Sequence, residues 1–136
     1  MIFTGASTLL AYLPADGANG PLDANLVDPA ASASGVFGGD VAALKLNIDF
    51  GDAGLTQGNA HVAFGDLTIC DQTALPALNG LTVREFSSSV NTLLGDGTGT
   101  YSIDQLDPVA QNLNAAFSGG WASAFAQQHL VNGTCP

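Results

Sequence analysis

Residues 82–95 read TVREFSSSVNTLLG and predict an amphipathic helix. Thr82 and Glu85 have the spacing of a capping box, in which the Thr82 hydroxyl accepts from the Glu85 amide and the Glu85 carboxylate accepts from the Thr82 amide. Gly95 is a residue type that commonly ends a helix. The apolar side chains fall on one helical face: Val83, Phe86, Val90, Leu93 and Leu94. We therefore expect a helix over 82–94 that packs on the core.

Two further helices are expected after it, over 103–117 and 121–130. Ser102 and Gln105 have the spacing of a second capping box. Asp107 precedes Pro108 and reads as a further helix start, with the aspartate as N-cap and the proline in the first helical position. The apolar face continues through this expected kink, and Ser-Gly-Gly at 118–120 ends the helix.

The segment 41–50 reads VAALKLNIDF and predicts a half-buried strand. Apolar residues alternate with Lys45, Asn47 and Asp49, which is the period of a strand with one polar face. Asp40 as a possible N-cap and the alanine pair that follows leave a helix as the alternative. A second strand fits 66–70, DLTIC. Strands followed by helices indicate an α+β domain.

The first 39 residues are rich in turn formers. One short apolar element, 9–13, precedes the stretch PADGANGPLDANLVDPAASASG, where proline and glycine preclude a long helix. The chain length fits a single domain over 1–136. We expect the 1–39 segment to lie over the surface of that domain and to take part in contacts between subunits.

Composition excludes several classes of partner. The chain has 136 residues, 12 of them acidic and 2 basic, and a net charge of -10. Nucleic acids and anionic lipid surfaces are bound mainly through Lys and Arg, so neither is expected as a partner. No apolar run is long enough for a membrane span. The start of the chain also lacks the basic region of a signal peptide, so we expect a processed chain or a piece of a longer precursor.

Cys70 and Cys135 are the two cysteines, and their even number suggests a disulfide. The charged fraction of 10% is far below the roughly 25% of ordinary soluble domains. This weakly charged, Gly- and Ser-rich composition favours an extracellular, oxidised protein over two buried free thiols. The spacing of the cysteines does not match a zinc site.

Candidate sites for chemistry are few. His61 and His129 stand outside any hydrolytic motif, and no phosphate loop or nucleophile elbow is present. Residues 96–107 partly resemble a calcium-binding loop between two helices. Its oxygen ligands would be Asp96, Thr98, Thr100, Asp104 and Asp107. The alternative is an ordinary connection whose polar residues cap helices, with no cofactor bound.

Four short motifs carry a resemblance to a known group of proteins. They are Gly38-Gly39, LKLN at 44–47, LNGLTV at 78–83 and LNAAF at 113–117. Together they resemble the C-terminal part of uncharacterised secreted bacterial proteins. The resemblance implies an extracellular destination and carries over no catalytic residue.

These observations predict a non-enzymatic, extracellular structural or surface module. The scarcity of charge suits self-association into a filament or matrix, or contact with other extracellular proteins. The alternatives are a calcium- or carbohydrate-binding adhesin domain and, third, a small secreted hydrolase that uses His61 or His129.

Overall fold

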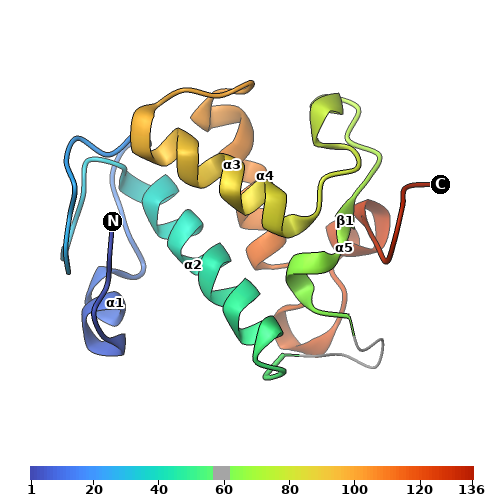
Figure 1. Cartoon of the computed structure of the whole chain (residues 1–136), viewed down its shortest axis with the longest axis horizontal. Helices are drawn as coiled ribbons and strands as arrows, with labels where there is room; N and C mark the ends of the chain where they lie inside the picture. The colour runs from blue at the N-terminus through green and yellow to red at the C-terminus, as the bar shows by residue number, and fades with distance from the viewer. Residues whose placement is uncertain (57–61) are drawn as a thin grey trace.

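The computed structural model describes residues 1–56 and 62–136 (Figure 1). In chain order the helices are α1 (Ala6–Tyr12), α2 (Gly35–Asp52), α3 (Val83–Asp96), α4 (Ile103–Asn114) and α5 (Ala124–His129). The strands are β1 (Thr68–Ile69) and β2 (Leu130–Val131). Short 3-10 turns complete the order: η1 (Phe64–Asp66), η2 (Pro76–Leu78) and η3 (Ser118–Gly120). The fold is α+β, as expected from the sequence.

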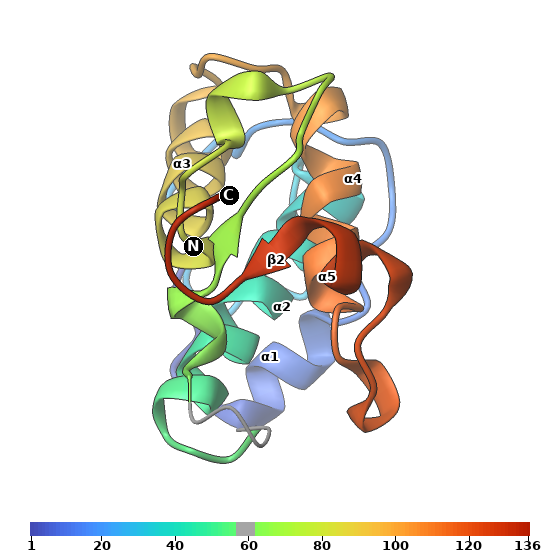
Figure 2. The ribbon, with the colours of Figure 1, turned by 90° about the vertical axis from the view of Figure 1, so that its right-hand side faces the viewer.

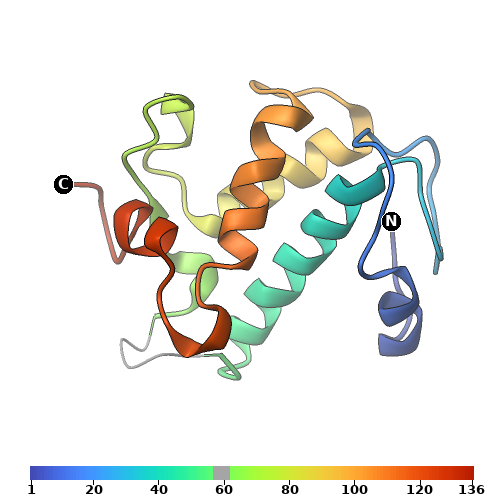
Figure 3. The ribbon, with the colours of Figure 1, turned by 180° about the vertical axis from the view of Figure 1, so that it is seen from behind.

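The core lies where α2 packs against α3 and α4 (Figures 1 and 3). Each helix contributes one apolar stripe. The fully buried members include Phe37 and Leu44 of α2, Phe86 and Val90 of α3, and Leu113 of α4. Burial of side chains of this size stabilises a fold by about 1.5–3 kcal/mol each.

The strand expected near 41–50 is wrong, because these residues lie in the 18-residue helix α2. Phe37, Val41, Leu44 and Ile48 are buried at the spacing of a helical face. The alternating pattern arose from Leu46, which is half-buried, and Phe50, which is 43% exposed. The helix also begins before Asp40, which is therefore not its N-cap.

The strand expected near 66–70 is confirmed at Thr68–Ile69. β1 pairs antiparallel with β2, with Thr68 opposite Val131 and Ile69 opposite Leu130 (Figure 2). On its other side the Ile69 amide donates to the Leu81 carbonyl at 2.8 Å. β1 thus joins the start of α3 to the C-terminal segment.

The disulfide between Cys70 and Cys135 is present, with the two Cα atoms 5.7 Å apart. It links residues 65 positions apart in the sequence. Cys70 is 1% exposed, so the bond ties the C-terminal tail directly to the core. The chain end is held by this bond in addition to the short β1–β2 pairing.

The ends of the helices follow the predicted caps in part. Thr82 and Glu85 form the expected capping box of α3, and Ser102 with Gln105 caps α4. α3 ends later than expected, at Asp96, and Gly97 adopts the left-handed conformation that closes it, with φ of 72°.

Asp107 is not an N-cap. It lies inside α4, which runs through Pro108 without a new start and ends at Asn114 rather than at 117. The helix expected over 121–130 is confined to Ala124–His129, where the Ser123 hydroxyl accepts from the Ala126 amide. Leu130 belongs to β2 because its backbone pairs with β1.

The N-terminal segment expected over 1–39 ends earlier, at 34, because residues 35–39 form the first turns of α2. It holds α1 and then passes the N-terminal end of α2 (Figure 1). Tyr12 is 2% exposed, and its hydroxyl lies 2.9 Å from the Ser32 hydroxyl. Gly39 allows the close approach, since a Cβ there would lie 2.8 Å from the Ala15 Cβ. Within the described residues, no helix is long and apolar enough to cross a membrane.

Replacing Thr82 by Ala should destabilise the protein by about 1 kcal/mol, because the Glu85 amide loses its acceptor. Urea unfolding followed by circular dichroism would measure the loss. Thr92→Ala is the matched control, since Thr92 is exposed in the middle of the same helix and its replacement should change stability by less than about 0.5 kcal/mol. Equal losses in the two variants would contradict the cap.

Removing the disulfide in a Cys70→Ser/Cys135→Ser variant should lower the free energy of unfolding by about 4 kcal/mol. The chain-entropy estimate for a closed loop of 65 residues gives this size. Denaturation of the oxidised and the reduced wild-type chain should show a similar gap. Identical midpoints would show that the bond contributes nothing to stability.

Candidate functional site

The first residues of the expected calcium-binding loop form hydrogen bonds with one another. The Asp96 carboxylate accepts from the Thr98 amide at 2.9 Å and from the Thr98 hydroxyl at 2.7 Å. These bonds hold the pKa of Asp96 below its ordinary value. Thr100 is exposed in the turn that follows. The carboxylate at the head of the loop therefore stabilises the turn after α3.

At the other end of the loop the two aspartates diverge. Asp104 is exposed in the first turn of α4, whereas Asp107 is 5% exposed and faces the interior. Among the described residues no three His, Cys, Asp or Glu side chains gather as a metal-binding group, so Asp96, Asp104 and Asp107 do not converge. Calcium binding by this loop stays a prediction.

A polar cluster forms where α4 crosses α2, and within it the side chain of Asp107 is buried. The Asp107 Oδ2 accepts from Asn19 Nδ2 at 2.8 Å and from Gln111 Nε2 at 3.1 Å. The same Gln111 nitrogen lies 3.0 Å from Asp40 Oδ2, so one amide bridges two carboxyl groups. We call Asp40 and Asp107 the carboxyl pair.

In the carboxyl pair, the pKa of Asp40 lies above its ordinary value. Burial is the largest cause that raises the pKa of Asp40, and the neighbouring Asp107 raises it further, to about 6, against the lowering effect of the Gln111 hydrogen bond. Sequence reasoning considered both residues as caps and Asp107 also as a ligand, but missed the pairing. A signal was available, because Asp107 shares its helical face with the apolar residues Ile103 and Ala110.

Asn19 connects the N-terminal segment to this cluster. Its Oδ1 accepts from the Phe37 amide at 2.9 Å, in the first turn of α2. Ser34, the local N-cap residue, makes no capping bond with its side chain. One side chain from the loop therefore caps α2 and, through Nδ2, reaches Asp107 on α4.

Asn19→Ala should destabilise the protein by about 1–3 kcal/mol, because the Phe37 amide and the buried Asp107 both lose a partner. Thermal and urea unfolding would measure this. Asn25→Ala, an exposed position in the same segment, is the matched control and should behave as wild type. A wild-type midpoint for Asn19→Ala would contradict the capping role.

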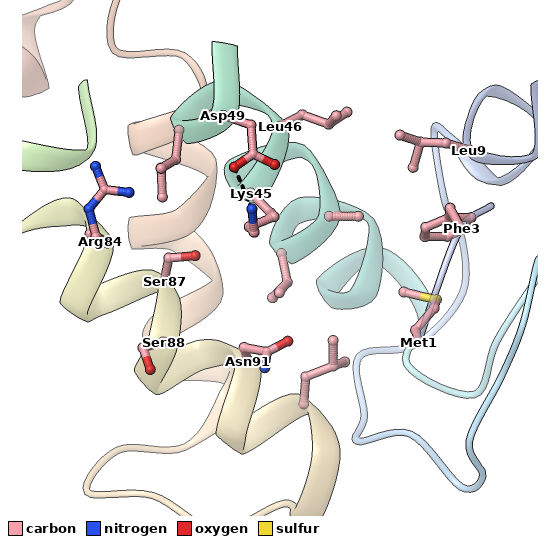
Figure 4. A pocket seen from close by; sticks show the side chains of 14 residues that line it. Met1, Phe3, Leu9, Lys45, Leu46, Asp49, Arg84, Ser87, Ser88 and Asn91 are labelled. Carbon is pink, nitrogen blue, oxygen red and sulfur yellow. Dashed lines mark hydrogen bonds and ion pairs between the residues drawn. The ribbon is translucent and has the colours of Figure 1, made fainter. Parts of the chain in front are cut away.

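A groove of about 550 Å³ lies between the N-terminal residues and the faces of α2 and α3 (Figure 4). Both basic side chains of the chain border it. Arg84 forms ion pairs with Asp52 at 2.8 Å and Asp66 at 3.0 Å, and Lys45 pairs with Asp49. These pairs neutralise the two cations, so the groove does not present a positive surface to an anion.

The side chain of His129 is held by contacts with Cys70 and Phe125. Its Nδ1 lies 3.0 Å from the Cys70 carbonyl oxygen, and its ring lies 4.9 Å from the Phe125 ring. These contacts fix α5 against the segment that follows β1. His61 lies outside the described residues.

Exposed aromatic side chains gather near the C-terminal ends of α2 and α4. Asn47 and Asn114 are hydrogen-bonded across the two helices at 3.0 Å. Phe50, near the end of α2, is 43% exposed, and Phe117, beyond the end of α4, is 45% exposed. Phe64 packs edge to face on Phe117, with ring centroids 6.1 Å apart.

Trp121 directly follows η3, lies four residues after Phe117 and is 82% exposed. We call Phe64, Phe117 and Trp121 the aromatic end. No Asp, Glu, Lys or Arg occurs after Asp107, so the C-terminal part of this surface is free of such charges. That sequence feature could have indicated the surface before the structure did.

Comparisons with family models, with curated proteins and with solved structures give no match to this chain. The resemblance to secreted bacterial proteins stays a prediction, and function is argued from the geometry of the described residues.

Proposed function

We propose that the chain is a non-enzymatic, extracellular structural or surface module that self-associates through the aromatic end. The observation that carries this proposal is the 82% exposure of Trp121, four residues after the partly exposed Phe117. Aromatic side chains bury about 150–250 Å² each and are enriched at protein interfaces. An exposed tryptophan is therefore a strong candidate for the centre of a contact.

Charge supports a second copy of the chain as the partner. A net charge of -10 opposes association when acidic faces meet. The aromatic end avoids this repulsion, since no charged side chain of the Asp, Glu, Lys or Arg type follows Asp107. Near Phe64, Asp66 is paired with Arg84, which also pairs with Asp52. Two copies can therefore meet here without opposing unpaired carboxylates.

An extracellular location is supported by the Cys70–Cys135 disulfide. Such bonds form and persist in oxidising compartments and are rare in the cytosol. Tight fixing of the C-terminal tail suits a protein that works outside the cell, where chain ends are targets of proteolysis.

Replacing Trp121 by Ser should weaken self-association at least tenfold, because a central aromatic residue typically contributes more than about 1.4 kcal/mol to an interface. Sedimentation velocity and light scattering over a concentration series would measure the assembly, and electron microscopy would show filaments. Leu10→Ser is the matched control, since Leu10 is 73% exposed on α1, and it should associate as wild type.

A wild-type chain that stays monomeric at high concentration would overturn this proposal. So would equal weakening in the Leu10→Ser control. Because the chain has a single tryptophan, its emission reports directly on whether Trp121 becomes buried during assembly.

A carbohydrate-binding adhesin is the second candidate, favoured by the same exposed Trp121 ring. A flat aromatic face can stack on a sugar ring as well as on another protein. Titration with soluble oligosaccharides at a concentration where the chain is monomeric distinguishes the two, since an emission change would then require the sugar. The calcium version is tested by thermal melting at millimolar calcium, where binding raises the midpoint.

The third alternative, a small secreted hydrolase, has less support. His129, one of its two proposed bases, is engaged by the Cys70 carbonyl oxygen and the Phe125 ring.

A further inference from the structure

The carboxyl pair contains a buried oxygen atom that lacks a donor. Asp107 is 5% exposed, and its Oδ1 has no hydrogen-bond partner among the described residues, although its Oδ2 has two. A buried carboxylate oxygen without a donor is costly. A hydrogen-bond donor at this oxygen would therefore stabilise the folded chain.

Asp40 can supply this hydrogen-bond donor. Gln111 Nε2 donates to both carboxyl groups, at 3.0 Å and 3.1 Å, which makes them neighbours. Asn114 Nδ2 donates to the Asp40 carbonyl at 3.0 Å and holds α4 against this turn of α2. A protonated Asp40 has an O–H donor, and Asp107 Oδ1 is the acceptor that needs one.

Among the described residues, neither Lys45 nor Arg84 donates to Asp107 in place of Asp40. Lys45 is paired with Asp49, and Arg84 with Asp52 and Asp66. From α4 the groups that face Asp40 are Asp107, which is titratable, and the amides of Gln111 and Asn114. From the N-terminal segment the side chain at the pair is the amide of Asn19.

We propose that protonated Asp40 donates a hydrogen bond to the buried Asp107, and that the carboxyl pair acts as a pH-sensitive latch for the N-terminal segment. The link to the segment is Asn19, which donates to Asp107 and accepts from the Phe37 amide. Loss of the proton leaves two neighbouring carboxylates whose repulsion disturbs Asp107. The cap that Asn19 provides to α2 then weakens, and residues 1–34 loosen.

The direction of the pH effect follows from the pKa of Asp40, raised from 3.8 to about 6 by burial and by Asp107. Between pH 3.8 and about 6, Asp40 of the folded chain holds a proton that Asp40 of the unfolded chain has released. Stability from the latch is thus fully present below about pH 4 and is lost as the pH rises through about 6. Because Asp40 is partly exposed, solvent screening reduces the effect to about tenfold in the opening equilibrium.

Other carboxyl groups contribute stability with the opposite pH dependence, and they do so over a lower pH range. Hydrogen bonds lower the pKa values of Asp28, Asp52, Glu85 and Asp96. The stability they contribute is present above their unfolded pKa values, near 4, and is lost at lower pH. The interval from pH 5 to 7.5 therefore excludes these four carboxyl groups, and the Asp40→Asn variant separates Asp40 from the two histidines, a residue type that ordinarily titrates in the same interval.

The test is amide hydrogen exchange at Phe37, measured by NMR from pH 5 to 7.5 on the full chain in a buffer with a chelator. After correction for the intrinsic exchange rate, wild-type protection should fall about tenfold across this range. Asp40→Asn should show flat protection, since its amide can donate to Asp107 at every pH. Asp49→Asn, which removes a carboxylate from the same helix, should keep the wild-type slope.

Carbon-13 carboxyl titration provides the second measurement. The titration of wild-type Asp40 should centre near pH 6 and should move part of the way down in Asp107→Asn, because the neighbouring charge is gone while burial, the largest cause, remains. A wild-type value near 4 would overturn the latch, and so would a slope that persists in Asp40→Asn. Restored protection on adding calcium at pH 7.5 would also overturn it, because the pair would then hold a cation.

Discussion

The packing of α2 against α3 and α4 is the interaction on which the rest of the structure depends. Phe37, Val41, Leu44 and Ile48 form one buried stripe along α2, and its removal from water is the main favourable contribution. Every other feature is placed relative to this helix. The N-terminal segment passes its first turns, the carboxyl pair lies near its start, and Phe64 of the aromatic end lies against Gly51 in its last turn.

β1 is the element relative to which the C-terminal segment of the chain is placed. Ile69 is fully buried, and its neighbours on both sides are backbone segments from distant parts of the chain. The disulfide from Cys70 adds a covalent link at the same place. Two strand residues and one disulfide therefore hold a C-terminal segment whose helix, α5, is too short to be stable alone.

Polar and apolar surfaces are divided between the two ends of the α2–α4 contact. Near the start of α2 the contact is made by amides and carboxyl groups, whose hydrogen bonds depend on protonation. At the other end the contact includes the hydrogen bond between Asn47 and Asn114, and the partly exposed Phe50 and Phe117 follow these residues in the sequence. This division separates a contact that responds to pH from a surface suited to association, and the proposed latch and the proposed assembly can be tested independently.

The sequence by itself determined the features that depend on residues close to one another. The capping boxes at Thr82 and Ser102 join groups three residues apart, so composition and spacing were sufficient. With two cysteines the disulfide had one possible intramolecular pairing. Residues 41–50 show the limit of this approach, because alternating apolar residues fit a strand until burial shows that Phe50 lies near the surface. The tertiary structure alone decided that Asp40 meets Asp107 and that Asn47 meets Asn114. These residues are far apart in the chain, and which of them meet depends on how α2 crosses α4.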